Sequence, residues 1–282
     1  QDDNFANIVH AVEEGRKIYQ NIRNFVRYQV STNVAAVALI VISTFIFGWE
    51  LPLTATQILV INILMDGPPA VALGVEKRHG NVMARPPRPV DEGLPSGKDI
   101  ALIFYLGAVM VIGTLIVFFL AGGGVYGTGN ECTIAPFATE SDAGFSIADC
   151  QAGDAEAVEA YNAYADDTFA NAQTMTFTVF IVFQLFNVLN CRSEKESLFS
   201  LGLFSNRAIN YAILASGFLL FLFVHFATFS LPIIGIEFGN LLSTTPLDRV
   251  DWLVLISVAS TVFLIEEFRK FMMNSGFFNV RR

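Results

Sequence analysis

Six apolar stretches follow one another along the chain, separated by shorter polar segments. They cover residues 28–48, 55–75, 100–121, 170–190, 208–231 and 251–268. Each is roughly 20 residues long, the length with which an α-helix crosses a ~30 Å hydrocarbon core. A transmembrane β-barrel would need alternating strands of about ten residues, a pattern that this sequence lacks. The pattern therefore predicts an all-α membrane protein, a polytopic bundle of six transmembrane helices.

Residues 1–27 form an amphipathic arm ahead of the first apolar stretch. Its apolar residues recur at i, i+3, i+4 and i+7, as Phe5, Ile8, Val9 and Val12. This spacing predicts a short helix, which Asp3 or Asn4 can cap. The stripe has no partner within the arm, so we expect it to lie on the membrane surface or to pack on a cytoplasmic domain outside this chain.

The charges predict how the six helices are oriented. Of the 282 residues 53% are hydrophobic and 15% charged, against about 25% charged in soluble domains. All lysines and arginines except Arg249 fall in the N-terminal arm, residues 76–98, residues 191–207 and the tail after 268. With six crossings these segments share one side, which the positive-inside rule makes cytoplasmic, together with both termini.

The loop at 123–167 lies on the opposite side and is strongly acidic. It has nine acidic residues and no Lys or Arg, which accounts for the net charge of −9. It is either a solvated cover or a vestibule that attracts cations. Its Cys132 and Cys150 can form a disulfide there, worth roughly 3 kcal/mol, or remain two free thiols. Cys191 is expected to be a reduced, packed residue.

Asp66 is the only acid near the middle of an apolar stretch. Ionisable groups at bilayer depth are costly and usually functional. Asn62 precedes Asp66 by one turn and shares its helix face. Pro68 and Pro69 lack N–H groups, which should break the helix and free the carbonyls before them. Such breaks build ion sites in transporters, although a kinked helix with a neutral, hydrogen-bonded Asp66 is the alternative.

Asn33 places a second amide on the preceding stretch. Carboxylate and amide oxygens suit Ca²⁺, Mn²⁺ or Mg²⁺, so Asn33, Asn62 and Asp66 are the predicted metal ligands. They supply at most four oxygens, whereas Ca²⁺ takes six to eight. Water, backbone carbonyls or another part of the protein must supply the rest.

The remaining polar residues in the apolar stretches favour structural roles. Gln184, Asn187 and Asn190 have a spacing suited to helix–helix contacts. His225 is expected to be packed or interfacial. Glu266 and Glu267 precede Arg269 and Lys270 and should pair with them at the membrane interface.

Three segments together resemble one known family. They are Asp2 to Arg16, the run Asn62-Ile63-Leu64-Met65-Asp66-Gly67-Pro68-Pro69-Ala70, and Thr174 to Ser193. The chain resembles the C-terminal membrane half of P-type calcium-transporting ATPases, and its sixth-helix motif has the secretory-pathway form. The resemblance implies the fifth to tenth membrane helices of such a pump, preceded by the end of its phosphorylation domain.

The resemblance also implies a single ion site. Asn33, Asn62 and Asp66 match ligands of the site that the family shares. Ala36, Met65 and Gln184 stand where sarcoplasmic-type pumps have glutamate, threonine and glutamate serving a second site. The implied cargo is one ion per cycle, Ca²⁺ or Mn²⁺, and the remaining ligands would come from a fourth membrane helix that this chain lacks.

The parts of a P-type pump that use ATP are not in this sequence. It has no Asp-Lys-Thr-Gly-Thr phosphorylation motif, no Thr-Gly-Glu loop and no Gly-Asp-Gly motif in that context. The chain alone therefore has no predicted catalytic residue and should not hydrolyse ATP. ATP and Mg²⁺ would act in the missing N-terminal half, which is the expected partner together with the lipid bilayer; no nucleic acid is expected.

These inferences give one domain plan. Residues 1–27 are the end of the phosphorylation domain and the stalk, 28–75 the ion-binding hairpin and 76–99 a cytoplasmic loop. Residues 100–268 are a four-helix region that includes the acidic loop, and 269–282 a cytoplasmic tail. The predicted function is the membrane half of an ATP-driven divalent-cation pump. A non-catalytic membrane module that binds or regulates a cation transporter is the alternative, and a passive cation pore is a third possibility.

Overall fold

The computed structural model describes most of the 282 residues. The described ranges are 5–76, 82–84, 86–87, 93–124, 132–136, 138–225, 230–231, 236–237 and 242–275. Within them the structure is helical apart from two strands of two residues each, which confirms the predicted all-α class.

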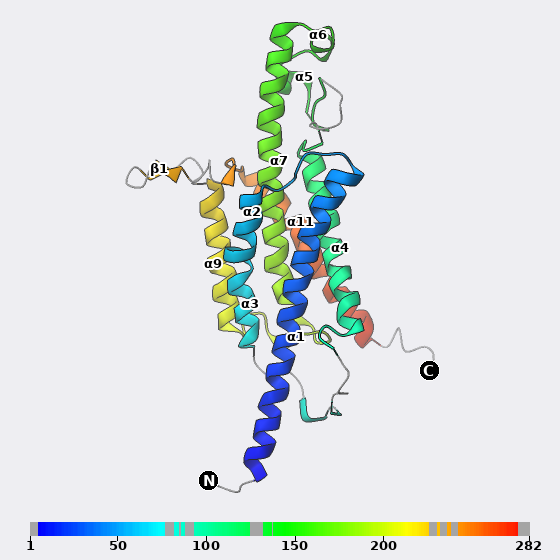
Figure 1. The fold of residues 1–282 in the computed structure, drawn as a ribbon, viewed down its shortest axis with the longest axis vertical. Coiled ribbons are helices and arrows are strands. Elements are labelled where there is room, and N and C mark those ends of the chain that lie inside the picture. Colours follow the sequence, from blue (N-terminus) through cyan, green and yellow to red (C-terminus); the bar gives the residue numbers. More distant parts are fainter. Residues whose placement is uncertain are drawn as a thin grey trace.

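The N-terminal arm and the first apolar stretch form one continuous helix. Helix α1 runs over Phe5–Val41 and passes into a π-helical turn, η1, at Ile42–Ile46. In Figure 1 the first half of α1 extends beyond the other helices at one end of the bundle. The predicted arm helix is thus confirmed, and it is continuous with the membrane helix.

The second apolar stretch is divided into three helical pieces. Helix α2 covers Ala55–Val60, the π-helical segment η2 covers Ile61–Met65, and α3 covers Gly67–Gly74. Thr54 starts α2 with a capping box, in which its side chain and that of Gln57 each accept the other's backbone N–H. The interruption before Pro68 occurs where it was predicted, but the helix widens into a π-turn and does not unwind. The 3₁₀ turn η3 follows at Val82–Ala84.

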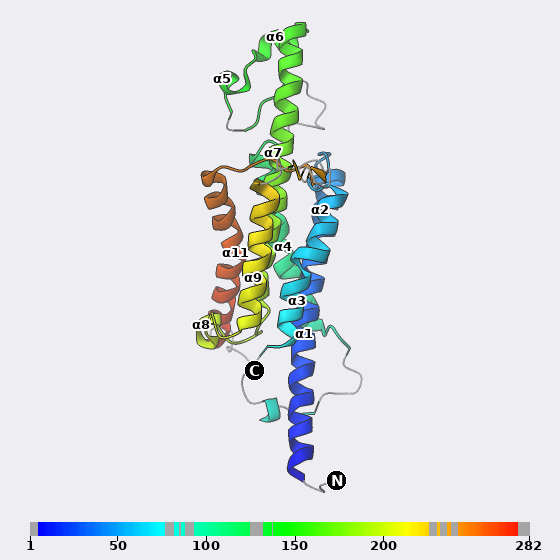
Figure 2. The same cartoon turned by 90° about the vertical axis from the view of Figure 1, so that its left-hand side faces the viewer.

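Two long helices carry the third and fourth apolar stretches. Helix α4 covers Gly97–Leu120 and α7 covers Ala155–Asn190, with the short helices α5, Glu140–Ala143, and α6, Ile147–Gln151, between them. Helix α7 begins well before the predicted residue 170, because Asp154 caps it and its first turns are rich in alanine. Part of the predicted outer loop is therefore a helix, which projects from the bundle in Figures 1 and 2.

The C-terminal third holds the remaining elements. They are α8, Leu198–Leu201, α9, Arg207–His225, and α11, Arg249–Asn274. Strands β1, Ser230–Leu231, and β2, Ile236–Glu237, pair antiparallel, with Ser230 opposite Glu237 and Leu231 opposite Ile236. The fifth stretch was predicted to be helical to residue 231; α9 ends at His225, and residues 226–229 lie outside the described part.

Helix α7 is the centre of the bundle. Figures 1 and 2 show α1, α4, α9 and α11 arranged around it, with α2 and α3 stacked along one side. Its Phe177, Phe180 and Phe183 are completely buried. Gly113 of α4 lies directly against Phe183, where an added Cβ would come within 2.4 Å of the ring. A glycine is therefore required at this helix crossing.

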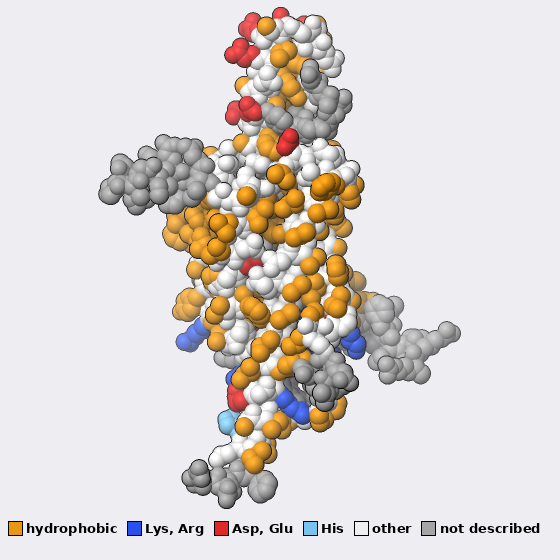
Figure 3. All heavy atoms as spheres, in the orientation of Figure 1, with side chains coloured by type: hydrophobic (Ala, Val, Ile, Leu, Met, Phe, Trp, Pro, Cys, Tyr) orange, Lys and Arg blue, Asp and Glu red, His pale blue; other side chains and the backbone are white. Residues whose placement is uncertain are grey.

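The surface matches a membrane environment. In Figure 3 hydrophobic side chains cover the middle of the visible face, Lys and Arg lie toward the lower end, and most of the visible Asp and Glu lie on the projecting upper part. We call the end at which α1 begins and α11 ends the basic end. Within the described part of the chain, five helical segments are long and apolar enough to cross a membrane. Helix α11 packs beside them but is not one of the five, so a sixth crossing remains a prediction.

Candidate ion-binding site

Asp66 lies at the point where the second membrane helix is interrupted. Its backbone N–H donates to the carbonyl of Ile61 at 2.9 Å, the i to i−5 bond of a π-turn, and its own carbonyl accepts from the N–H of Ala70 at 3.0 Å. Pro68 and Pro69 in the first turn of α3 have no N–H to continue the ladder. The side chain of Asp66 is completely buried. The helix break thus places a carboxylate inside the bundle.

Two hydroxyl groups of α1 contact this carboxylate. Tyr28 donates from its phenol to Oδ1 of Asp66 at 3.1 Å, and the Thr32 hydroxyl lies 3.1 Å from Oδ2. Thr32 also lies 3.0 Å from the carbonyl of Gln29, and its single proton can serve only one of these acceptors at a time. Among the described residues, Lys and Arg side chains form ion pairs with other acids, and none of these pairs involves Asp66. An acid held in this way is suited to a bound cation.

The backbone carbonyl of Met65, next to the helix break, makes a further contact near the site. Pro69 leaves the Met65 carbonyl without its usual helical donor. That oxygen lies 3.5 Å from the hydroxyl of Ser216 on α9, which is buried. One of the carbonyls that were predicted to be freed is therefore only weakly bonded, at the long limit of a hydrogen bond.

The three predicted ligands differ in burial. Asp66 is buried against α1, whereas Asn33 and Asn62 lie on exposed helix surfaces. In the described part of the chain no group of three or more His, Cys, Asp or Glu could hold a metal ion. Tyr28 and Thr32 were not predicted. The sequence could have indicated them, because Tyr28 and Thr32 are one helical turn apart and Thr32 precedes Asn33, at the depth of the predicted site.

The polar residues of α7 divide into two kinds. Asn187 donates to the Ser31 hydroxyl at 2.9 Å, and Asn190 donates to the carbonyl of Val262 at 3.1 Å, which are the predicted helix–helix contacts. Gln184 is also buried, but neither its amide oxygen nor its amide nitrogen has a partner among the described residues. Gln184 is therefore packed inside the bundle without a hydrogen bond from its amide to the described residues.

The polar residues near the ends of α9 and α11 are paired as predicted. His225 accepts a hydrogen bond at 3.0 Å from the indole of Trp252, which makes it a packed residue. Glu266 pairs with Arg269 at 2.6 Å, and Glu267 pairs with Lys270 at 3.2 Å. These groups bond to one another and not to Asp66 in the described structure, so they are separate from the candidate site.

The acidic loop predicted at 123–167 contains a small folded unit outside the bundle, which we call the acidic hairpin. A disulfide joins Cys132 and Cys150, which settles the alternative that the sequence left open. Phe145 packs beside the bridge against the ring of Tyr161. Thr139 donates to the exposed Asp142 and holds the pKa of that carboxyl below its usual value. The hairpin thus has its own core, separate from the membrane bundle.

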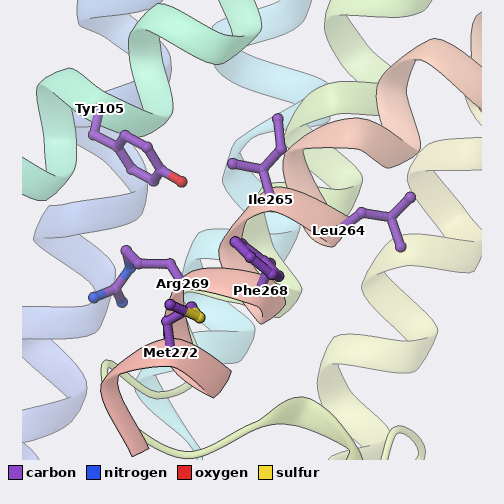
Figure 4. Close-up of a pocket in the computed structure, with 6 residues that line it drawn as sticks. All are labelled: Tyr105, Leu264, Ile265, Phe268, Arg269 and Met272. Atoms are coloured by element: carbon purple, nitrogen blue, oxygen red, sulfur yellow. The ribbon is translucent and has the colours of Figure 1, made fainter. Parts of the chain in front are cut away.

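A cavity of about 450 Å³ lies elsewhere, between α4 and α11. Figure 4 shows Tyr105 reaching from α4 toward side chains of α11. The lining residues are Tyr105, Leu264, Ile265, Phe268, Arg269 and Met272. The lining includes neither Asp66 nor its hydroxyl partners, so this cavity is not part of the candidate ion site.

Fold and site together define a class: an integral membrane helical bundle with a buried carboxylate at the break of a membrane helix. Residues 50–272 match the family model described as "Cation transporting ATPase, C-terminus". The chain belongs to this family and is the C-terminal membrane region of a P-type cation-transporting ATPase.

Its relatives are calcium-transporting ATPases. The chain is 37% identical over 269 residues to calcium-transporting ATPase 1 of Schizosaccharomyces pombe, covering 95% of this chain and 24% of the relative. It is 35% identical over 271 residues to calcium-transporting ATPase type 2C member 2 of Mus musculus, covering 95% and 23%, respectively. It is 34% identical over 269 residues to type 2C member 1 of Homo sapiens, covering 95% and 24%. The chain thus spans about a quarter of the length of these relatives.

Proposed function

We propose that this chain is the ion-carrying membrane part of an ATP-driven pump for Ca²⁺, which also accepts Mn²⁺. The observation that carries the proposal is Asp66, a fully buried carboxylate at a break in a membrane helix. The relatives are named as calcium-transporting ATPases, which supports Ca²⁺ as cargo. Hard carboxylate and amide oxygens accept both cations.

In this proposal Asn33 and Asn62 are ligands together with Asp66. Both asparagines lie on helix surfaces that are open in this chain. A further membrane helix laid over these surfaces would bury the amides and supply the oxygens that Ca²⁺ still needs. The remainder of the pump, including its first four membrane helices, is the partner that we expect to provide this cover.

The proposed transport cycle uses alternating access. The basic end would face the cytoplasm, α11 would be the sixth crossing, and the acidic hairpin would lie on the other side. Ions would reach Asp66 from the cytoplasm. Phosphorylation in domains outside this chain, using ATP and Mg²⁺, would tilt α1 and move Tyr28 and Thr32 relative to Asp66. The site would then open to the opposite side.

The test is transport by a complete pump. This chain would replace the matching C-terminal quarter of the fission yeast relative, and ATP-dependent ⁴⁵Ca²⁺ uptake would be measured in vesicles. We expect uptake in this assembly and its loss in Asp66→Asn, which keeps the side chain's shape but removes its charge. Asp142→Asn, in the outer hairpin, is the matched control and should transport normally.

Three outcomes would refute the proposal in different ways. Uptake that survives in Asp66→Asn would show that Asp66 is not an ion ligand. An assembled, membrane-inserted protein that takes up no Ca²⁺ would favour the non-catalytic module. Cation flux through liposomes that contain the chain alone, without ATP, would indicate a passive pore.

A further inference from the structure

Helix α3 needs an anchor at its far end. It has only eight residues, and its first residue follows the π-turn and Asp66, where the helical hydrogen-bond ladder is interrupted. So short a helix does not hold its own direction in space. The orientation of Asp66, just before the start of α3, therefore depends on what holds the end at Gly74.

Glu76 provides the charged part of that anchor. It lies two residues after α3 and is 1% exposed. Its carboxylate accepts two parallel hydrogen bonds from Arg192, Nε to Oε2 and Nη2 to Oε1, both at 3.0 Å. Asn206 donates to the same carboxylate at 2.8 Å. A bidentate pair of this kind fixes geometry as well as charge.

Arg192 connects this carboxylate to other helices. It follows the end of α7 and is completely buried. Its Nη1 donates to the carbonyl of Gly202 at 3.1 Å, and its Nη2 donates to the hydroxyl of Ser205 at 2.6 Å. Both acceptors lie in the loop that leads into α9. The guanidinium thus joins the ends of α3, α7 and α9 in one buried cluster.

Two amide side chains of helix α1 also contact the cluster. The amide of Asn21 donates to the carbonyls of Gly74 and Glu76 at 3.0 and 3.1 Å. The amide of Asn24 donates to the carbonyl of Arg192 at 2.9 Å. Neutral hydrogen bonds are weaker than charge-assisted ones. The cluster therefore holds α3 to α7 and α9 through charge-assisted bonds and to α1 through the amides of Asn21 and Asn24.

We propose that Glu76 and Arg192 are positioning residues for the ion site, a role that rests on the proposed function. They fix the far end of α3, so that Asp66 keeps its place while α1 moves past it. Asp66 and Glu76 are ten residues apart, roughly 15 Å along a helix. A displacement of α3 at Glu76 would therefore also displace the carboxylate of Asp66 at the other end of the helix.

The first experiment measures Ca²⁺ dependence in the complete pump. Arg192→Lys keeps the charge but cannot form the bidentate fork, and the double variant Glu76→Gln/Arg192→Gln leaves no unpaired buried charge. We expect both to raise the Ca²⁺ concentration for half-maximal ATPase activity roughly tenfold, a change of about 1.4 kcal/mol. Maximal activity at saturating Ca²⁺ should stay within about twofold. Lys195→Gln, an exposed charge in the same loop, is the control.

The second experiment does not depend on transport. Hydrogen exchange of the α3 amides is followed in the full chain in lipid nanodiscs. Faster exchange in Glu76→Gln than in Lys195→Gln is expected, because the end of α3 loses its charged anchor. Unchanged exchange, or an unchanged half-saturating Ca²⁺ concentration in variants that remain folded, would overturn the inference. A wild-type pump without any uptake would count against the proposed function, and the exchange result would still decide the role of the pair.

Discussion

Replacing Asp99 by asparagine should strongly destabilise the basic end of the bundle. Asp99 is 2% exposed and accepts hydrogen bonds from Arg23 at 2.7 Å, from Arg27 at 3.1 Å and from the Ser96 hydroxyl at 2.7 Å. Asparagine keeps the shape but removes the negative charge. Among the described residues, the two arginines would keep the more distant Glu194 as an ion-pair partner, at 3.5 and 3.7 Å. Arg23 would also keep its hydrogen bond to the Ser96 hydroxyl, at 3.2 Å.

The size of the effect follows from the burial of Arg27. Arg27 is 2% exposed, and its Nε and Nη1 already have no partner in the described part of the structure. Breaking a buried ion pair by removing one partner costs about 3–5 kcal/mol. Glu194 remains nearby, so we expect the lower end, about 3 kcal/mol. At roughly 2–4 °C per kcal/mol, the midpoint of thermal unfolding should fall by roughly 6–12 °C.

The chain contains its own probe for this measurement. Cys191 is its one free cysteine and is completely buried, while Cys132 and Cys150 are joined in the disulfide. A thiol-reactive fluorogenic maleimide should therefore label the protein only as it unfolds during heating in detergent. Asp142→Asn is the matched control, because Asp142 also closes a capping box but is exposed and is bonded to Thr139 rather than to an arginine in the described structure. Its midpoint should move by less than roughly 2 °C.

Two results would refute this reasoning. The first is an Asp99→Asn midpoint equal to that of Asp142→Asn. The second concerns the double variant Asp99→Asn/Arg27→Met, which removes the unpaired buried charge. It should be more stable than Asp99→Asn alone, and a further loss of stability would show that the charge is not the cause.

Three further predictions concern packing, thiol chemistry and the outer hairpin. Gly113→Ala places a Cβ 2.4 Å from the ring of Phe183 and should cost about 1–3 kcal/mol, read from the same thermal midpoint. Burial raises the pKa of the Cys191 thiol to about 12, so labelling of the folded chain should stay slow at pH 8 and rise only toward strongly alkaline pH; fast labelling at pH 8 would contradict this. Replacing Cys132 and Cys150 by serine should destabilise the hairpin by about 3 kcal/mol, seen as faster proteolysis there without a change in the half-saturating Ca²⁺ concentration.

The sequence predicted the helices where the signal was local. Pro68 and Pro69 cannot continue a helical ladder, so the interruption near Asp66 was predictable from two residues. The π-helical form of that interruption was not, because it depends on how α2 and α3 pack on α1. The early start of α7 could have been predicted from Asp154, which caps the helix, and from the alanines that follow it. We predicted a loop there because the segment is strongly acidic.

The candidate site was also predictable only in part, because some of its features are local in the sequence and others depend on how the helices pack. Asp66 stood out because a lone acid at bilayer depth is rare, and the structure buries it as expected. Tyr28 and Thr32 became its partners only through the contact of α1 with the second membrane helix, which periodicity does not specify. Asn33 and Asn62 remain ligand predictions, since they lie on exposed surfaces. Long-range pairs such as Glu76 with Arg192 are likewise set by tertiary packing.

The number of ions bound by a complete pump tests the central claim most directly. Bound ⁴⁵Ca²⁺ would be counted per phosphorylatable pump containing this chain, at saturating Ca²⁺ and without ATP. The account predicts one ion per pump in the wild type and none in Asp66→Asn at the same Ca²⁺ concentration. Full binding by the Asp66→Asn variant would contradict the claim that this buried carboxylate holds the transported ion.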